Sequence, residues 1–309
     1  MAKANFTNNV FIRGYVFSHT LQARETADYK YISGLLNVAT DDEALNVVPV
    51  NFFVREKTKS GGMNATYANL KQIIDTNNTF ENAGTDALRV RIDGAIDVND
   101  FYNREGELVT GKRVRGSFCH FLNATESMTP AAQFEADVLL QAAVERESND
   151  GSAYLSLQGF AFNYRGDVLP VTFSISSPEG MAFFENEDIS AANPYFGKVC
   201  GDIRSNVVVT KQETDDTQVA FGAPMVHETS RTFRTWEVVA ANVNSGMDES
   251  TITQEELEKG IKERETRLAD LKAKTAERNG STSGVAGFPA SAAPFQSAAP
   301  ATNDKNYVF

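Results

Sequence analysis

Leu45–Arg55 reads LNVVPVNFFVR, a run of β-branched and aromatic residues that predicts a β-strand. A second run of this type, VLPVTFSIS, covers Val168–Ser176. Each run carries a proline early in the strand, where the missing backbone N–H requires an edge or a bulge. We interpret the two runs as corresponding strands of two related β-domains in tandem.

The chain around the first run predicts the order three strands, helix, two strands. Four further stretches have strand-like composition: Val10–Phe17, Tyr29–Ala39, Leu88–Val98 and Arg113–Asn123. Asn64 is a suitable N-cap for a helix over Asn64–Asp75, and Asp100–Gly111 is expected to be a long hairpin loop. Glycines interrupt these strands, as the corners of a small closed barrel require: Gly14, Gly34, Gly94 and Gly116. The pattern favours an OB-fold, a five-stranded Greek-key barrel, over an unspecified antiparallel sandwich.

Residues 134–243 repeat this plan. Their strand-like stretches are Phe134–Glu147, Tyr154–Tyr164, Val168–Ser176, Val207–Lys211 and Thr232–Ala241, with a short helix starting at Pro178. Thr253 and Glu256 form a capping-box pattern for a helix through Arg278, and Asn279–Thr302 has the composition of a flexible tether. The predicted fold is mainly β, with tandem OB-fold-like five-stranded barrels at 1–125 and 126–245, a C-terminal helix at 246–278 and a disordered tail at 279–309.

The composition of the 309-residue chain is that of a soluble globular protein, without a membrane span or an apolar signal core at the N-terminus. Two cysteines form no disulfide framework, so a cytoplasmic location is expected. The net charge is −12. Residues 1–125 hold 14 basic and 14 acidic residues, whereas residues 126–245 hold 7 and 17. A site for a polyanion is therefore expected in the first domain, because phosphates respond to the local potential.

Catalytic chemistry is not indicated. His19, His120 and His227 are far apart in sequence and lie in no metal or nucleophile motif. Cys119 and His120 are neighbours in a strand, so their side chains point to opposite faces. No pair of carboxylates stands out as a general acid and base. We expect a binding protein that uses no cofactor and no metal, rather than an enzyme.

Aromatic and basic residues alternate through the first domain. Single-stranded nucleic acid is held by bases stacked on aromatic rings, while Lys and Arg follow the phosphates. The candidate binding residues are Arg13, Tyr15, Phe53, Arg55, Lys57, Arg89, Arg91, Tyr102, Arg104, Lys112, Arg113 and Arg115. Arg89 with Arg91, and Arg113 with Arg115, each share a strand face. The alternatives are that single aromatics pack in the core and that the arginines pair with Asp93, Asp97 or Glu107.

Three segments of the first domain resemble the bacterial and phage single-stranded DNA-binding proteins. Asn9–Val16 resembles that family's first strand, Val50–Lys57 its third, and Val90–Ile96 its fourth. The hairpin with Tyr102 and Gly106 is similar to its fourth-to-fifth loop, and the end of the chain to its partner-recruiting tail. The chain departs from the family in lacking the usual Trp near Phe53, in having Asp304 in place of an acidic cluster, and in its second barrel.

The resemblance implies sequence-independent binding of single-stranded DNA during replication, recombination or repair. The doubled barrel and divergent tail suggest a phage or plasmid protein. It also implies a tail that recruits partner proteins through Asp304, Tyr307, Val308 and Phe309. A homo-oligomer is compatible with this role, and the acidic second domain is expected mainly to serve architecture, a protein partner or self-association. Two alternatives remain at this point: a structural, virion-type assembly protein that binds no DNA, and an enzyme or inhibitor that uses a barrel to grip another protein.

Overall fold

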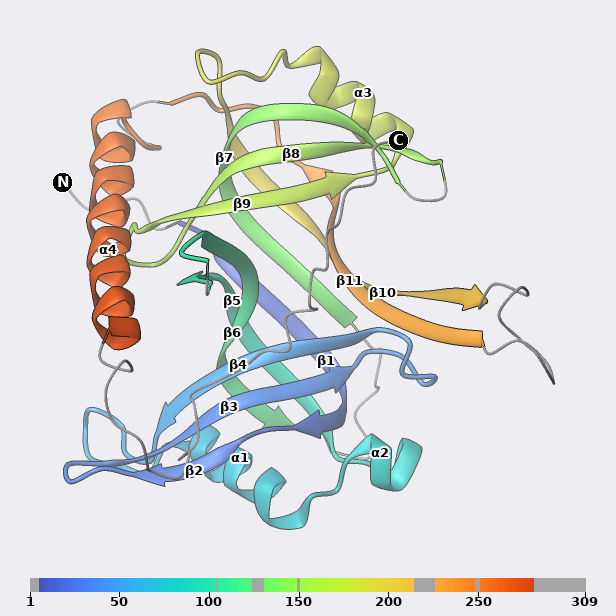
Figure 1. Cartoon of the computed structure of the whole chain (residues 1–309), viewed down its shortest axis with the longest axis vertical. Coiled ribbons are helices and arrows are strands. Elements are labelled where there is room, and N and C mark those ends of the chain that lie inside the picture. Colours follow the sequence, from blue (N-terminus) through green and yellow to red (C-terminus); the bar gives the residue numbers. More distant parts are fainter. Residues whose placement is uncertain are drawn as a thin grey trace.

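The computed structural model describes residues 6–103, 105–123, 131–148, 151–213, 226–247 and 251–280 (Figure 1). Its eleven described strands form one continuous, strongly coiled sheet, and a C-terminal helix packs along one side. The expected tail and its residues Asp304, Tyr307, Val308 and Phe309 lie outside the described residues, as does Arg104.

Barrel 1 consists of five strands: β1 (Asn8–His19), β3 (Lys30–Ala39), β4 (Val47–Arg55), β5 (Arg89–Tyr102) and β6 (Leu108–Phe121). β1 pairs with both β3 and β5, β4 with β3, and β6 with β5. A short parallel contact between β4 and β6, at Val50 and Val114, closes the barrel. This connectivity is that of the OB-fold. Apolar side chains alternate inward along each strand, and Ile12, Leu36 and Ile92 are fully buried.

Short elements complete barrel 1: β2 (Gln22–Glu25), α1 (Ala65–Thr76), α2 (Phe80–Ala83) and the 3₁₀ turn η1 (Gly84–Asp86). α1 begins as expected, because the side chain of its N-cap Asn64 accepts a hydrogen bond from the backbone N–H of Thr66. Leu70 and Ile73 of α1 pack into the barrel core. The close approach expected at Gly14 is also present, since a Cβ there would lie 2.0 Å from the carbonyl oxygen of Ala39.

Barrel 2 repeats the order with β7 (Ala131–Glu147), β8 (Ala153–Phe162), β9 (Val168–Ile175), α3 (Pro178–Asn186), β10 (Tyr195–Glu213) and β11 (Val226–Ala241). β7 pairs with β8 and β10, β9 with β8, and β11 with β10. One parallel bridge, between Ser174 and Glu237, closes this barrel. The two β-domains inferred from the sequence therefore share one connectivity.

An internal two-fold relates the barrels. Val10 pairs with Gly94 in barrel 1, and Phe134 pairs with Gly201 in barrel 2, so Val10 and Phe134 are equivalent. These two residues also pair with each other where β1 runs antiparallel to β7. A contact between equivalent residues is what a two-fold axis produces, here within one chain. The β1–β7 pairing joins both barrels into a single sheet.

The prolines that suggested the repeat are not equivalent. The bridge between Asn51 and Arg115 corresponds to the bridge between Ser174 and Glu237. Pro49 precedes Asn51 by two residues, so its equivalent is Thr172 rather than Pro170. Pro49 itself lies just before the short β4–β6 contact, where its missing N–H leaves no strand partner unsatisfied.

Three other sequence predictions need correction. The expected loop over Asp100–Gly111 is mostly strand, since β5 and β6 pair as far as Tyr102 and Leu108. β2 was not predicted, because its four exposed polar residues carry no apolar alternation. β10 begins at Tyr195, although only Val207–Lys211 was expected, since glycines at 197 and 201 interrupt the β-branched pattern.

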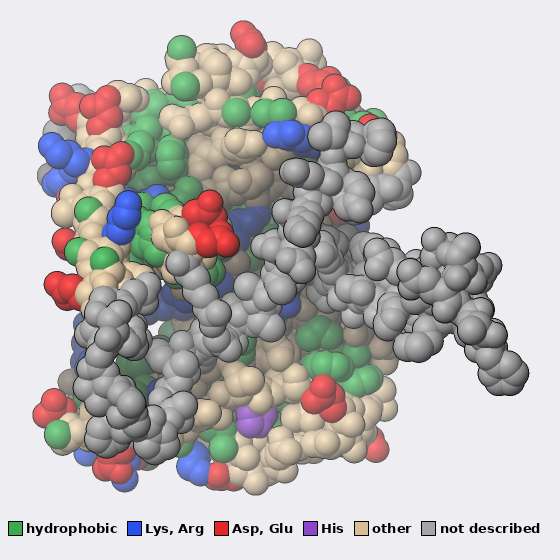
Figure 2. Space-filling model, viewed as in Figure 1, with side chains coloured by type: hydrophobic (Ala, Val, Ile, Leu, Met, Phe, Trp, Pro, Cys, Tyr) green, Lys and Arg blue, Asp and Glu red, His purple; other side chains and the backbone are tan. Residues whose placement is uncertain are grey.

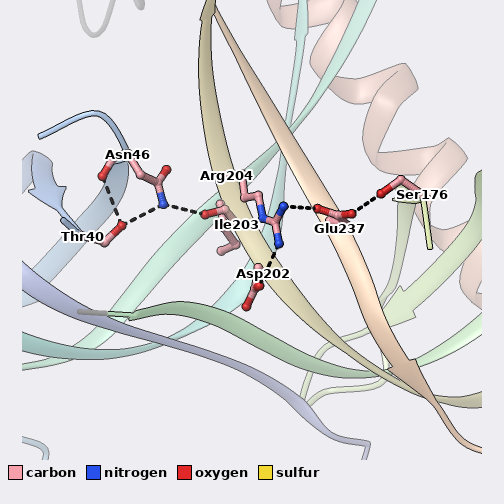
Figure 3. A network of polar contacts seen from close by, with 7 residues as sticks. All are labelled: Thr40, Asn46, Ser176, Asp202, Ile203, Arg204 and Glu237. Carbon is pink, nitrogen blue, oxygen red and sulfur yellow. Dashed lines mark hydrogen bonds and ion pairs between the residues drawn. The ribbon is translucent and has the colours of Figure 1, made fainter. Parts of the chain in front are cut away.

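The hairpin of each barrel touches the other barrel. Lys112 of β6 donates a hydrogen bond to the carbonyl oxygen of Thr172 in β9. In the opposite direction, Ser205 of β10 donates through Oγ to the carbonyl of Val47 in β4, at 2.8 Å. Asn46 adds two hydrogen bonds to β10. Its Nδ2 donates to the carbonyl of Ile203 at 3.0 Å (Figure 3). Its Oδ1 accepts from the N–H of Ser205 at 2.7 Å.

α4 (Gln254–Gly280) holds the β5–β6 hairpin against barrel 2. It starts with the expected capping box, because Thr253 and Glu256 exchange hydrogen bonds. Leu257 is buried beside Val168 on the outer side of barrel 2. About two turns further along, Arg264 forms an ion pair with Asp100 of β5 at 2.6 Å. Leu257 and the partly buried Ile261 therefore dock α4 on barrel 2.

Candidate nucleic-acid interface

Three aromatic rings form a row on the outer face of barrel 1, which we call the aromatic platform: Tyr29, Tyr31 and Phe53. Tyr31 of β3 and Phe53 of β4 have ring centroids 5.0 Å apart, and Tyr29 follows at 5.7 Å from Tyr31. Phe52 points into the core and Phe53 outward, because neighbouring residues of a strand face opposite sides. Phe53 is 55% exposed, so the platform offers an apolar ring face to solvent.

Cations accompany the aromatic platform. The guanidinium of Arg55 lies 4.3 Å from the ring centroid of Tyr29, a cation–π contact. Arg115 of β6 is exposed and pairs in register with Asn51, two residues before Phe53 on the neighbouring strand. Among the described residues, no ion pair involves Arg55 or Arg115. Lys57, beyond the end of β4, is also exposed. These positive charges are available to an anionic ligand.

The other candidate arginines lie on the outer side of the β1–β5–β6 sheet. Arg13 and Arg91 are cross-strand partners, and Arg13 also lies over the ring of Phe11 at 5.2 Å. Nε of Arg91 is 3.5 Å from the carboxylate of Asp93. Arg89 donates to the carbonyl of Asn123 at 2.8 Å. The structure thus brings Arg13, Arg91 and Arg89 to one side of the barrel, with a carboxylate among them.

Arg113 pairs with a carboxylate, which was the alternative to DNA binding that the sequence left open. Its guanidinium forms an ion pair with Asp97 across the hairpin, at 2.6 Å. Its neighbour Arg115 faces Ala95 at the corresponding cross-strand position, where no carboxylate is available. Two arginines on one strand face are therefore in different electrostatic states, and only Arg115 retains an unneutralised charge.

Three candidates pack against protein instead of facing solvent. Tyr15 is buried with Phe80 against its ring, and desolvation together with Asp42 raises its pKa. Tyr102 donates through its hydroxyl to the carbonyl of Leu268 in α4, at 3.4 Å. Lys112 reaches barrel 2. In this arrangement Tyr15 and Tyr102 do not contribute to the aromatic platform.

A family model matches residues 7–274, which include both barrels and most of α4. Its description is YorF. The chain belongs to the YorF family. No curated protein matches the sequence at a significant level. Among solved structures, a deletion mutant of the single-stranded DNA-binding protein from Thermus aquaticus is similar, with 14% identity and a TM-score of 0.48. The similarity covers 79% of the YorF-family chain and 98% of the other chain.

Among the described residues of barrel 2 in this YorF-family protein, no ring stands in the positions of Tyr31 and Phe53. Following the strand ladders, Tyr31 corresponds to Ser152 and Phe53 to Ser176. Glu237 stands in the position of Arg115. Small hydroxyl side chains and a carboxylate therefore replace two rings and a cation, although the backbone plan is the same.

The described part of this YorF-family chain contains no group of three or more His, Cys, Asp or Glu residues arranged to hold a metal ion. Within the same residues, no helix has the length and apolar character needed to cross a membrane.

The sequence of this YorF-family protein did not single out Tyr29 and Tyr31 as candidate binding residues. The signal was present, because Tyr29, Tyr31 and Phe53 all belong to strand-like stretches in which alternate residues face outward. What was lacking was the β3–β4 register, which places Tyr31 opposite Arg55 and so beside Phe53.

Proposed function

We propose that this protein binds single-stranded DNA without sequence preference, through the aromatic platform of barrel 1. The observation that carries the proposal is the row of rings ending in the exposed Phe53, on the β3–β4 face of an OB-type barrel. β3 and β4 are the second and third strands of that barrel, whose outer face binds oligonucleotides in this fold. All four bases have a flat π-face, so stacking on these rings does not depend on the base sequence of the DNA.

The charge distribution supports the same surface. Stacking contributes about 1–3 kcal/mol per base, and phosphates that follow the bases need cations nearby. Arg55 and Arg115 are exposed beside the aromatic platform, whereas barrel 2 carries Glu237 in the position of Arg115. A polyanion is therefore directed to barrel 1 in a chain with a net charge of −12.

The proposed role is to coat and protect exposed single strands in the cytoplasm during replication, recombination or repair. Tail residues Asp304, Tyr307, Val308 and Phe309 are proposed to recruit partner proteins, by analogy with the family that the first domain resembles. Removal of Asn303–Phe309 should then leave DNA affinity unchanged or raised and abolish the capture of partners. Weaker DNA binding by the truncated chain would contradict this part of the proposal.

The decisive experiment replaces one ring of the platform. Phe53→Ala should weaken the binding of oligo-dT at low salt by about 1–3 kcal/mol, since one stacked base is lost. Fluorescence anisotropy measures this loss. Tyr164→Ala is a matched control, because Tyr164 is 73% exposed and carries Arg165 over its ring at 5.3 Å, but lies outside the aromatic platform, in the turn between β8 and β9.

If wild type and Phe53→Ala bound oligo-dT with equal affinity, the aromatic platform would not be part of the binding site. Failure of the wild type to bind oligo-dT at low salt would refute DNA binding itself. Comparison with double-stranded DNA and with RNA of the same length then defines the nucleic acid, because stacking on exposed rings requires unpaired bases.

A further inference from the structure

A groove separates the β5–β6 hairpin of barrel 1 from the outer face of barrel 2. Its volume is about 710 Å³, and uncharged polar side chains line much of it: Thr110, Gln141, Gln158 and Thr172. Figure 2 shows that the molecule is hollowed between the two barrels, with Lys and Arg side chains visible in the hollow. Gln158 and Thr172 belong to β8 and β9, the second and third strands of barrel 2. The groove therefore lies on the face that binds oligonucleotides in OB barrels.

Lys112 lies in the wall of this groove. Its amino group donates to the carbonyl of Thr172 and lies 5.0 Å from the ring centroid of Phe173 and 5.3 Å from that of Trp236. None of the ion pairs among the described residues includes Lys112. Desolvation lowers the pKa of Lys112 to about 7. The ammonium thus has spare hydrogen-bond donors and lacks a counter-ion.

The internal two-fold places a second cation in the equivalent position. Gly116 of β6 corresponds to Val238 of β11, since each faces the fourth-strand glycine of its barrel. Counting back four residues makes Arg234 the equivalent of Lys112. Arg234 also has a pKa lowered by desolvation. Each hairpin therefore carries a partly desolvated cation, and at Lys112, which lines the groove, an anion would relieve the cost of burying positive charge.

We propose that this groove is a second contact for the same single strand, in which Lys112 binds a backbone phosphate and the amides of Gln141 and Gln158 hydrogen-bond to base edges. An amide both donates and accepts, so it suits any of the four bases. A volume within the roughly 300–1,000 Å³ of ordinary ligand pockets has room for a nucleotide. The inference rests on the proposed function and adds barrel 2 to the DNA-binding surface, where the sequence suggested an architectural role.

The test measures oligo-dT affinity against salt concentration for the wild type and Lys112→Met. Each phosphate contact contributes about −0.7 to the slope of log affinity against log salt for single strands, so Lys112→Met should make the slope less negative by about that amount. Lys259→Met is the matched control, because Lys259 is exposed on α4 and already pairs with Glu263. Its slope should equal that of the wild type.

Measuring oligo-dT affinity against pH distinguishes phosphate binding by Lys112 from a purely structural contact of this side chain. Wild-type affinity should fall between about pH 6 and about pH 8.5 as Lys112 loses its proton, and Lys112→Arg should abolish that fall, because an arginine stays protonated. The charged groups near Lys112 along the β5–β6 hairpin are the ion pairs Arg113–Asp97 and Arg264–Asp100.

Gln158→Glu is the second variant, and it serves even if Lys112→Met does not fold. Gln158 is exposed on β8, so a carboxylate is tolerated there and should weaken binding by repelling phosphate. An unchanged salt slope and pH profile in Lys112→Met, with unchanged affinity in Gln158→Glu, would overturn the inference while leaving platform binding intact. Loss of the Lys112 contribution on adding inorganic phosphate at constant ionic strength would assign the groove to free phosphate and also overturn it. Failure of the wild type to bind any oligo-dT would instead refute the proposed function.

Discussion

Arg115 of β6 and Glu237 of β11 occupy equivalent positions in the two barrels and carry opposite charges. Each lies at the parallel contact that closes its barrel, opposite Asn51 and Ser174 respectively. Glu237 is engaged within barrel 2, where it pairs with Arg204 at 2.8 Å and accepts a hydrogen bond from Ser176 (Figure 3). Arg115 has no such partner among the described residues. One position therefore offers a free positive charge and the other a neutralised negative charge.

The first prediction concerns Arg115. Arg115→Ala should make the salt slope of oligo-dT binding less negative by about 0.7, because one phosphate contact is lost. Arg113→Ala is the control on the same strand face, and its slope should stay at the wild-type value, since Arg113 already pairs with Asp97. Binding titrations at several salt concentrations give both slopes. Equal slopes for Arg115→Ala and the wild type would exclude Arg115 from the interface.

The second prediction concerns the close approach of β1 to β3. Gly14→Ala should lower the free energy of unfolding by about 1–3 kcal/mol, because its Cβ would lie 2.0 Å from the carbonyl oxygen of Ala39 and the strands would have to separate. Gly111→Ala should have little effect, since nothing lies within 4 Å of a Cβ at that position. Urea unfolding followed by circular dichroism measures both. Equal stability of the two variants would contradict the β1–β3 geometry.

The third prediction concerns the pH dependence of stability at Lys112. Between about 7, its pKa in the folded protein, and its ordinary value of 10.5, the unfolded chain binds a proton that the folded protein does not. The free energy of unfolding contributed by this group therefore rises with pH across that range. Lys112→Met should remove this rise and have its largest stabilising effect below pH 7. Parallel stability–pH curves for wild type and variant would show that the Lys112 amino group is solvated.

The fourth prediction concerns the contact between Asn46 and β10. Asn46→Ala should destabilise the protein by about 1–3 kcal/mol, because the carbonyl of Ile203 and the N–H of Ser205 both lose a hydrogen-bond partner. Asn242→Ala is the control, since Asn242 is exposed and bonds through its backbone, donating its N–H to the carbonyl of Lys198 and accepting from the hydroxyl of Tyr195. Differential scanning calorimetry should show a lower Tm for Asn46→Ala alone. An unchanged Tm would mean that the barrels are held together elsewhere.

Local signals in the sequence were reliable where neighbours along the chain decide the outcome. The Asn64 cap, the capping box at Thr253 and the outward position of Phe53 are set within a few residues, by hydrogen bonds to the next turn or by strand alternation. Tyr15 obeys the same alternation, but α2 covers it, so its face of the strand is not exposed. Whether a strand face is exposed to solvent depends on segments distant in sequence, so local patterns do not predict it.

Taken alone, the sequence determined the five-strand plan, its repetition and the uneven distribution of charge, because alternation, caps and composition act over short distances. Only the tertiary structure decided which aromatic residues meet, since Tyr29, Tyr31 and Phe53 become one surface through the β3–β4 register. It also separated Arg115 from Arg113 by placing Asp97 beside one of them, and it carried Lys112 into barrel 2. The physical reason is that registers, ion pairs and desolvation arise from contacts between strands far apart in the chain, which short-range patterns leave open.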